Sequence, residues 1–265
     1  MIRAFVFDLD GTLVETEEVK ALSYARAATE LRPDLNEGEV VAAFGDLVGL
    51  SRQEVAVSLM RRFGLEDAAR ARMAEFGVGT PWQAYVQIRL GIYEEMLGDP
   101  KLIQEHCYSH NIALLRSVRQ EGFPTALATQ SHREQALRVL GILGLEDEFD
   151  VVVTRDDVEH GKPDPEMHLL AARELDFEAG ECLAIEDSPA GVQGALAAGM
   201  EIIAVTTRLT RQRFRDTDLL DRCHVVDDPS TLPGIVHRLI GAAGKPPQSI
   251  YERRVREGVE EGPET

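Results

Sequence analysis

The sequence predicts an α/β protein, with a doubly wound parallel β-sheet as its core and an inserted α-helical domain. Short apolar runs alternate with amphipathic segments in the second half of the chain, which is typical of strands joined by helices. The first apolar run, residues 2–7, is interrupted only by Arg3, as in a strand buried on both faces. Residues 15–97 show helical spacing and little strand character.

The composition narrows the class of protein further. The 265 residues, 44% of them hydrophobic, suffice for one large or two modest domains with a proper core. We expect no signal peptide and no membrane span. The net charge of −18 would repel nucleic acid and anionic membranes. The cysteines at positions 107, 182 and 223 lack metal-ligand spacing and imply no disulfide framework, so we expect a cytoplasmic protein.

The inserted segment contains several helix-start signals. Asn36 is suited to cap a short helix, and Ser51 with Glu54 forms a capping box. Thr80 and Gln83 form a second box around a proline at the first helical position. The predicted helices of the insertion cover residues 17–31, 36–44, 51–63, 66–76 and 80–97.

In the remaining chain, strands and helices alternate. The predicted strands are residues 125–128, 149–153, 182–185, 202–205 and 224–226, and the predicted helices are residues 110–120, 131–140, 165–175, 189–198 and 231–240. Ser131, with Glu134, is expected to cap the second of these helices. This alternation implies a Rossmann-like parallel sheet covered by helices on both faces. We expect the core to comprise residues 1–15 and 99–244, the helical domain residues 16–98, and a mobile polar tail residues 245–265.

Two acidic residues, Asp8 and Asp10, follow directly after the first strand, and Gly11 permits a tight turn there. Ligands of open parallel sheets bind where strands end at their carboxyl edge. Two carboxylates this close repel each other, and a bound cation or a shared proton would relieve the repulsion. A strand followed by an Asx-type turn is the simpler alternative.

Three further polar stretches also follow predicted strands. Residues 129–131 offer hydroxyls and backbone N–H groups at a helix start, which could bind an anion or simply cap the helix. Lys162, between a glycine and a proline, would place a fixed ammonium where a phosphate could bind. Glu186 and Asp187 end another apolar strand and, with Asp8 and Asp10, could surround a hard cation such as magnesium.

This ordered set resembles the haloacid dehalogenase-like hydrolase superfamily. The motifs that carry the resemblance are DLDGT at residues 8–12, ATQS at 128–131, GKPDP at 161–165 and EDSPAG at 186–191. The resemblance extends to about residue 244. The helical insertion resembles the cap domain of the subgroup that contains beta-phosphoglucomutase and many small phosphatases.

The resemblance implies specific roles for individual residues. Asp8 matches the nucleophile that forms an aspartyl-phosphate, and Asp10 matches the general acid and base. Thr129 and Lys162 match the groups that hold the transferring phosphoryl group. The implied cofactor is Mg²⁺, and the implied metal set is Asp8, the backbone carbonyl of Asp10, Asp187, and Glu186 directly or through water. The candidate substrate-binding residues are Lys20, Arg52, Gln130 and Ser131.

Some residues help to choose within the superfamily. The acid at Asp10 favours phosphoryl transfer over cleavage of C–Cl or C–P bonds. The threonine at position 12 resembles the phosphatases of the superfamily more than the mutases, which usually have valine or isoleucine at the matching position. Arg52 resembles the mutase arginine that binds a second phosphate, although an exposed arginine in a helical turn is the alternative. Lys20 replaces a usual histidine and either supplies charge to an anionic substrate or is simply solvated. Arg89 is a weaker candidate, for which a surface ion pair is the preferred interpretation.

We therefore expect a magnesium-dependent phosphatase that acts on a small phosphorylated metabolite, such as a sugar phosphate. The alternatives are a beta-phosphoglucomutase-like hexose-phosphate mutase and a non-catalytic regulator that binds metal or phosphate. We expect neither nucleic acid nor membrane as a partner, and a monomer or a weak dimer.

Overall fold

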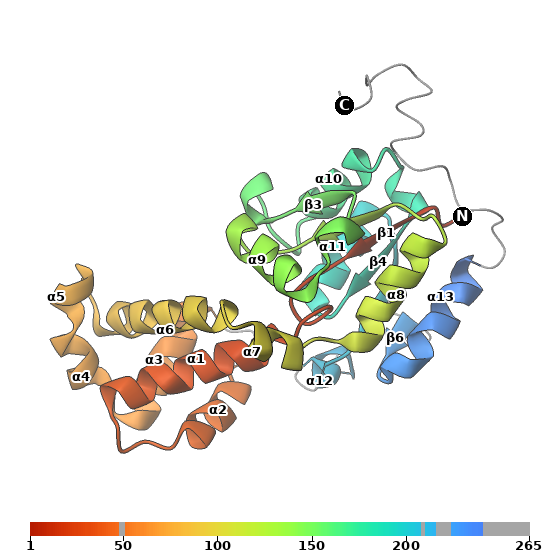
Figure 1. Cartoon of the computed structure of the whole chain (residues 1–265). Helices are drawn as coiled ribbons and strands as arrows, with labels where there is room; N and C mark the ends of the chain where they lie inside the picture. The colour runs from red at the N-terminus through yellow and green to blue at the C-terminus, as the bar shows by residue number, and fades with distance from the viewer. Residues whose placement is uncertain (48–50, 208–209, 216–223, 241–265) are drawn as a thin grey trace, which may run out of the picture. The chain divides into compact units, whose positions relative to one another are not determined.

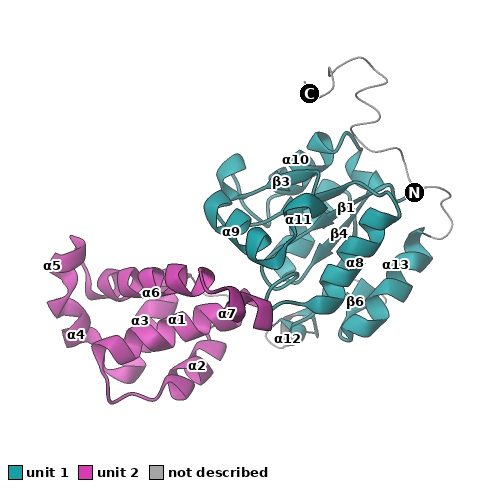
Figure 2. Ribbon diagram, in the orientation of Figure 1, with its two compact units in different colours: residues 1–14, 106–265 teal, residues 15–105 magenta. Residues whose placement is uncertain are grey.

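The computed structural model describes residues 1–47, 51–207, 210–215 and 224–240. It divides into two compact units, coloured separately in Figure 2: an α/β unit of residues 1–14 and 106 onward, and a helical unit of residues 15–105. The expected helical domain, residues 16–98, ends earlier than this unit because helix α7 (Pro100–Glu105) was not predicted. The expected tail, residues 245–265, lies outside the described residues.

Among the described residues, the α/β unit is built on one sheet of six parallel strands, which confirms the predicted fold class. The strands are β1 (Ala4–Phe7), β2 (Thr125–Ala128), β3 (Val151–Val153), β4 (Cys182–Glu186), β5 (Glu201–Val205) and β6 (Val225–Val226). Their order in the sheet is β3-β2-β1-β4-β5-β6. The chain runs outward from β1 to β3 and then returns to β4, so the order of the strands reverses between β1 and β4. In such sheets, ligands bind beyond the carboxyl ends of the strands at this reversal.

Helices cover the sheet on both faces, as Figure 1 shows. They are α8 (Ser109–Gln120), α9 (Arg133–Leu143), α10 (Glu166–Glu174), α11 (Pro189–Ala198), α12 (Arg211–Arg215) and α13 (Leu232–Ile240). Side chains alternate along β1: Ala4 and Val6 join one core cluster with residues of α10 and α11. Phe5 lies on the other face, where its ring contacts Phe123 edge-on at 5.3 Å between centroids. Burial on both faces explains why this strand is almost wholly apolar.

The helical unit contains α1 (Thr16–Leu31), α2 (Glu37–Gly45), α3 (Arg52–Phe63), α4 (Glu66–Ala71), α5 (Met73–Phe76), α6 (Pro81–Leu97) and α7. Helix α1 packs against α2 and α6, and Tyr24, Leu59 and Tyr85 lie in the shared core. Asn36 caps α2, and Ser51 forms the predicted capping box at the start of α3. The single helix predicted over residues 66–76 is two short helices in the structure. In the described part of the chain, none of the helices has the length and apolarity needed to cross a membrane.

Candidate active site at the carboxyl edge of the sheet

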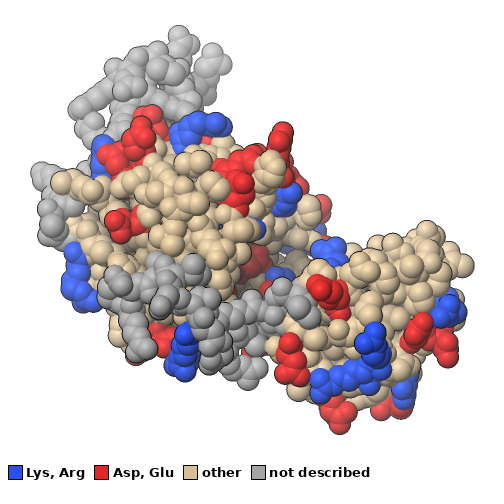
Figure 3. Space-filling model, turned by 180° about the vertical axis from the view of Figure 1, so that it is seen from behind, with Lys and Arg blue, Asp and Glu red and all other residues tan. Residues whose placement is uncertain are grey.

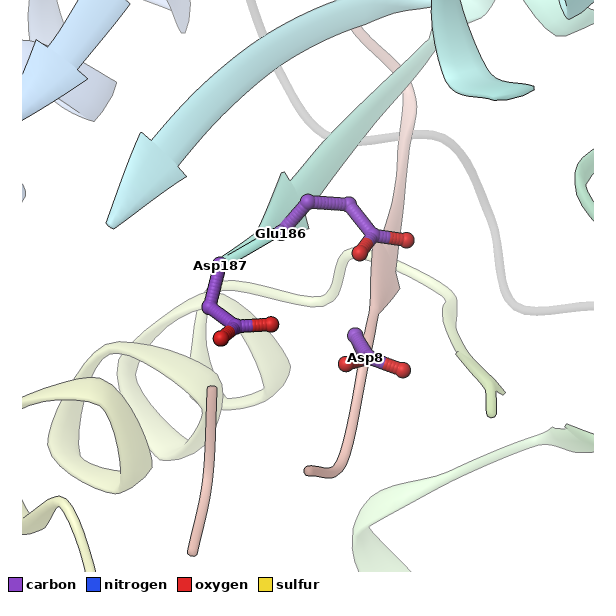
Figure 4. Close-up of side chains that lie close together, drawn as sticks. All are labelled: Asp8, Glu186 and Asp187. Atoms are coloured by element: carbon purple, nitrogen blue, oxygen red, sulfur yellow. The ribbon is translucent and has the colours of Figure 1, made fainter. Parts of the chain in front are cut away.

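Three buried carboxylates meet beyond the ends of β1 and β4, where the strand order reverses. Asp8 follows β1, Glu186 is the last residue of β4, and Asp187 comes next. Their ligand oxygens all lie within 4.8 Å of one another, and Figure 4 shows the three side chains extending into a common space. Parallel pairing of β1 with β4 places these residues together, because both strands end at the same edge.

Lys162 joins two of these carboxylates. Its Nζ lies 2.8 Å from Oδ1 of Asp8 and 2.7 Å from Oε1 of Glu186. The same ammonium donates to the carbonyl oxygen of Ala128 at 2.8 Å, and only 3% of the Lys162 side chain is exposed. Burial by itself would lower the pKa of Lys162, but the charges of Asp8 and Glu186 outweigh burial and raise it. The lysine therefore carries a full positive charge inside the site.

The carboxylates differ in their affinity for a proton. Burial raises the pKa of Asp8 to about 7; Lys162 opposes this rise, and the charges of Glu186 and Asp10 reinforce it. Burial also favours a raised pKa for Glu186, but Lys162 and His168 outweigh it and hold the pKa below its ordinary value. When Asp8, Glu186 and Asp187 are all ionised, the single ammonium leaves a formal surplus of two negative charges, which a divalent cation would neutralise.

The residues present fit Mg²⁺. All three members of the acidic cluster offer carboxylate oxygens, the ligands that this hard cation prefers. Within the described residues, Oε2 of Glu186 is buried and has no hydrogen-bond partner, so a ligand oxygen remains available. The cluster does not include the carboxylate of Asp10, and the implied metal ligand at that position is the backbone carbonyl.

The Asp10 side chain instead points to the stretch after β2. Its Oδ2 accepts a hydrogen bond from the Ser131 hydroxyl at 2.6 Å and one from the Thr129 hydroxyl at 3.3 Å. The Thr129 oxygen also accepts from the backbone N–H of Ser131 at 3.1 Å. The prediction that Ser131 caps the next helix is wrong: α9 begins at Arg133, with His132 as its N-cap residue. An N-cap serine accepts from a backbone N–H, whereas here the Ser131 hydroxyl donates to the carboxylate of Asp10, and hydrogen bonds to an ionised acceptor are the stronger ones.

Gln130 connects two loops of the site. Its Nε2 donates to the carbonyl oxygen of Lys162 at 3.2 Å. A Cβ placed on Gly161 would lie only 2.2 Å from Oε1 of Gln130, so glycine makes room for this contact. The side chain expected to bind substrate thus also contacts the loop that carries Lys162.

The remaining candidates, Lys20 and Arg52, belong to the helical unit. Lys20 Nζ lies 2.8 Å from Oε1 of Glu17 on the same helix. Arg52 is exposed at the first residue of α3, where it lines, with Trp82, a hollow of about 460 Å³. Arg89 is buried rather than paired at the surface: its guanidinium stacks over Tyr93 at 4.3 Å. The expectation of a surface ion pair for Arg89 is therefore wrong.

Two buried residues of the site were missed by sequence reasoning. His168, on α10, has its Nε2 2.9 Å from Oε1 of Glu186. Asn111, on α8, donates through Nδ2 to the carbonyl oxygen of Thr12 at 2.7 Å and so holds the loop after β1. His168 stands alone among the apolar residues of its helix, and a buried imidazole requires a polar partner, so its presence was a usable signal. Asn111 gave no such signal.

The surface of the described residues carries both positively and negatively charged side chains. On the face in Figure 3, acidic and basic groups of the described residues are interspersed. The buried ammonium of Lys162 is therefore a local feature of the site, in a chain whose net charge is −18.

Comparisons with known proteins agree with this geometry. The model of the haloacid dehalogenase-like hydrolase family matches residues 2–199. Hexitol phosphatase A of Escherichia coli (strain K12) is 30% identical over 218 residues, covering 82% of this chain and 89% of the relative. Beta-phosphoglucomutase of Bacillus subtilis (strain 168) is 29% identical over 208 residues, covering 77% and 83%. The crystal structure of beta-phosphoglucomutase from Clostridium difficile aligns with a TM-score of 0.60 at 20% identity. The alignment covers 91% of this chain and 100% of that one, and it shows a similar fold alone.

Proposed function

The chain belongs to the haloacid dehalogenase-like hydrolase family and is a phosphoric monoester hydrolase, and we propose that it is a magnesium-dependent phosphatase of a small sugar phosphate or similar monoester. The observation that carries this proposal is the contact of the buried Lys162 ammonium with Asp8 and Glu186. It places a fixed positive charge beside the carboxylate that would attack phosphorus. Phosphoryl transfer depends mainly on such positioning and charge compensation.

In the first step, a carboxylate oxygen of Asp8 attacks the phosphorus of the monoester. The bond between phosphorus and the leaving oxygen breaks, an aspartyl-phosphate forms, and protonated Asp10 donates its proton to the departing alcohol. Lys162 and Thr129 hold the phosphoryl oxygens. Magnesium, bound by Asp8, Asp187, the Asp10 carbonyl and Glu186 directly or through water, would compensate the negative charge that meets at phosphorus.

In the second step, the Asp10 carboxylate accepts a proton from water as the water oxygen attacks the phosphorus. The acyl-phosphate bond breaks, inorganic phosphate leaves, and Asp8 and Asp10 return to their starting forms. The hydrogen bonds from Ser131 and Thr129 to Oδ2 of Asp10 support this role, because they hold the carboxylate in one orientation.

The helical unit is proposed as the cap that selects the substrate. Lys20 and Arg52 would supply its positive charges, and Gln130 and Ser131 would contact the substrate from the α/β unit. The similarity to Hexitol phosphatase A supports a phosphorylated polyol or sugar as the substrate class.

A hexose-phosphate mutase remains the second candidate, favoured by Arg52 and by the similarity to beta-phosphoglucomutase of Bacillus subtilis. The two activities are separated by incubating the protein with sugar and polyol phosphates in the presence of Mg²⁺. We expect release of inorganic phosphate, whereas isomerisation without release would establish the mutase. Binding without any turnover would establish the third possibility, a non-catalytic regulator.

The nucleophile is tested with Asp8→Asn, which keeps the shape of the side chain and removes its nucleophilic charge. We expect kcat to fall by at least about 10³-fold. Circular dichroism should show that the variant keeps the wild-type fold. Asp46→Asn is the matched control, because Asp46 is an exposed residue of the helical unit that pairs with Arg62. Wild-type turnover by Asp8→Asn would refute the assignment.

A further inference from the structure

His168 contacts the acidic cluster through Glu186. The imidazole is fully buried on α10, and its Nε2 lies 2.9 Å from Oε1 of Glu186. The same oxygen lies 2.7 Å from Nζ of Lys162. We propose that His168 is a positioning residue that, together with Lys162, holds Oε1 of Glu186 and so leaves Oε2 oriented for the metal shell. This inference rests on the magnesium site of the proposed function.

The hydrogen-bond pattern assigns the proton of His168. An ionised carboxylate can only accept, so Nε2 must carry the hydrogen in this contact. Nδ1 is buried and has no hydrogen-bond partner among the described residues. A bare Nδ1 lone pair is tolerated more easily there than a second N–H, which would be a buried donor without an acceptor. His168 therefore holds Glu186 through the Nε2 donor.

Helix α11 makes room for this pair with two glycines spaced three residues apart on one face. A Cβ on Gly191 would lie 1.9 Å from Oε2 of Glu186. A Cβ on Gly194 would lie 3.2 Å from Nδ1 of His168. Glycine inside a helix is unfavourable, and here it allows the carboxylate and the imidazole to lie directly against the helix. The packing thus selects one placement of Glu186 and of the ring that holds it.

The orientation of Glu186 is consequently set by two donors on one oxygen. Without the imidazole, Lys162 is the remaining charged partner of this carboxylate among the described residues, and Lys162 also binds Asp8. Groups that orient a metal ligand typically contribute about 10–100-fold to metal affinity. Loss of the His168 donor should therefore weaken Mg²⁺ binding more than it lowers kcat at saturating Mg²⁺.

The test uses the full chain without substrate and measures Mg²⁺ affinity by isothermal titration calorimetry. We expect His168→Phe, which keeps a ring and loses the donor, to weaken binding by about 10–100-fold. His168→Gln places an amide donor near the position of Nε2 and should restore most of the affinity, whereas His168→Asn is too short and should not. His110→Phe, at an exposed position on α8, is the control and should bind like wild type.

The Gln and Asn variants keep the test decisive even where the Phe variant is unstable, because both are polar and differ in reach. Equal Mg²⁺ affinity of His168→Phe and wild type would overturn the proposal, as would equal losses in the Gln and Asn variants. The KM for Mg²⁺ and kcat of His168→Phe are then measured separately by phosphate release. We expect the KM for Mg²⁺ to change more than kcat. Wild-type protein that binds Mg²⁺ but releases no phosphate from any substrate would contradict the phosphatase and leave the calorimetric test of His168 intact.

Discussion

The carboxylate of Asp187 lies where a side chain at position 11 would be: a Cβ on Gly11 would be 2.1 Å from Oδ2 of Asp187. Gly11 also has a φ of +80°, a conformation that residues with a side chain rarely adopt. The turn after β1 is therefore packed directly against the turn after β4. Two separate requirements, the backbone angle and the space for Asp187, both demand glycine.

Replacement of Gly11 by alanine should displace Asp187 and strain the turn. We expect kcat to fall at least about 100-fold, and stability to fall by about 1–3 kcal/mol. Phosphate release and chemical unfolding measure the two effects. Gly91→Ala is the control, because a Cβ there meets no atom within 4 Å. A Gly11→Ala enzyme with wild-type activity would show that Asp187 does not need its present position.

Replacement of Lys162 by methionine should leave Asp8 and Glu186 buried without their cation. We expect the free energy of unfolding at pH 8 to fall by about 3–5 kcal/mol. The loss should shrink as the pH falls, because protonation of the buried acids removes the uncompensated charge. Urea unfolding at pH 8 and pH 5.5 tests this, with the exposed Lys101→Met as control. An equal loss at both pH values would contradict the electrostatic explanation.

Magnesium affinity should increase with pH around neutrality. In the metal-free protein the pKa of Asp8 is raised to about 7, so below this pH the carboxyl group is largely protonated. The metal requires the carboxylate, and binding must then release a proton, so affinity should weaken by up to about tenfold per pH unit below this pKa. Above it, affinity should level off. Calorimetry in buffers of different ionisation enthalpy counts the released proton, and binding at pH 6 without release of a proton would exclude this coupling.

Replacement of Ser131 by alanine should impair the proton transfers assigned to Asp10. The hydroxyl donates to Oδ2 of Asp10 at 2.6 Å, and its loss leaves the longer bond of 3.3 Å from Thr129 to that oxygen, which holds the carboxylate less firmly. We expect kcat to fall about tenfold with little change in KM, because general acid–base groups act in the transition state. Ser230→Ala is the matched control, since it removes an exposed serine bond to Asp228 of 2.8 Å. A change confined to KM would point to substrate binding by Ser131 instead.

The site could be predicted where it depends on strand ends. Asp8 and Asp187 were predicted together because carboxyl ends of adjacent parallel strands lie at one edge. The prediction failed for Ser131, where a local capping pattern competed with the distant Asp10 carboxylate. It failed also for Arg89, because spacing along one helix does not reveal that the guanidinium stacks on Tyr24 and Tyr93.

The sequence by itself determined the alternation of strands and helices, the helix caps at Asn36 and Ser51, and which acids leave the strands. These features depend on residues a few positions apart, so periodicity and capping chemistry reveal them. Only the tertiary structure decided that Lys162 lies between Asp8 and Glu186, and that His168 holds Glu186. Such partners are set by how separate crossovers pack on one sheet, and burial then makes each polar group take the nearest donor or acceptor.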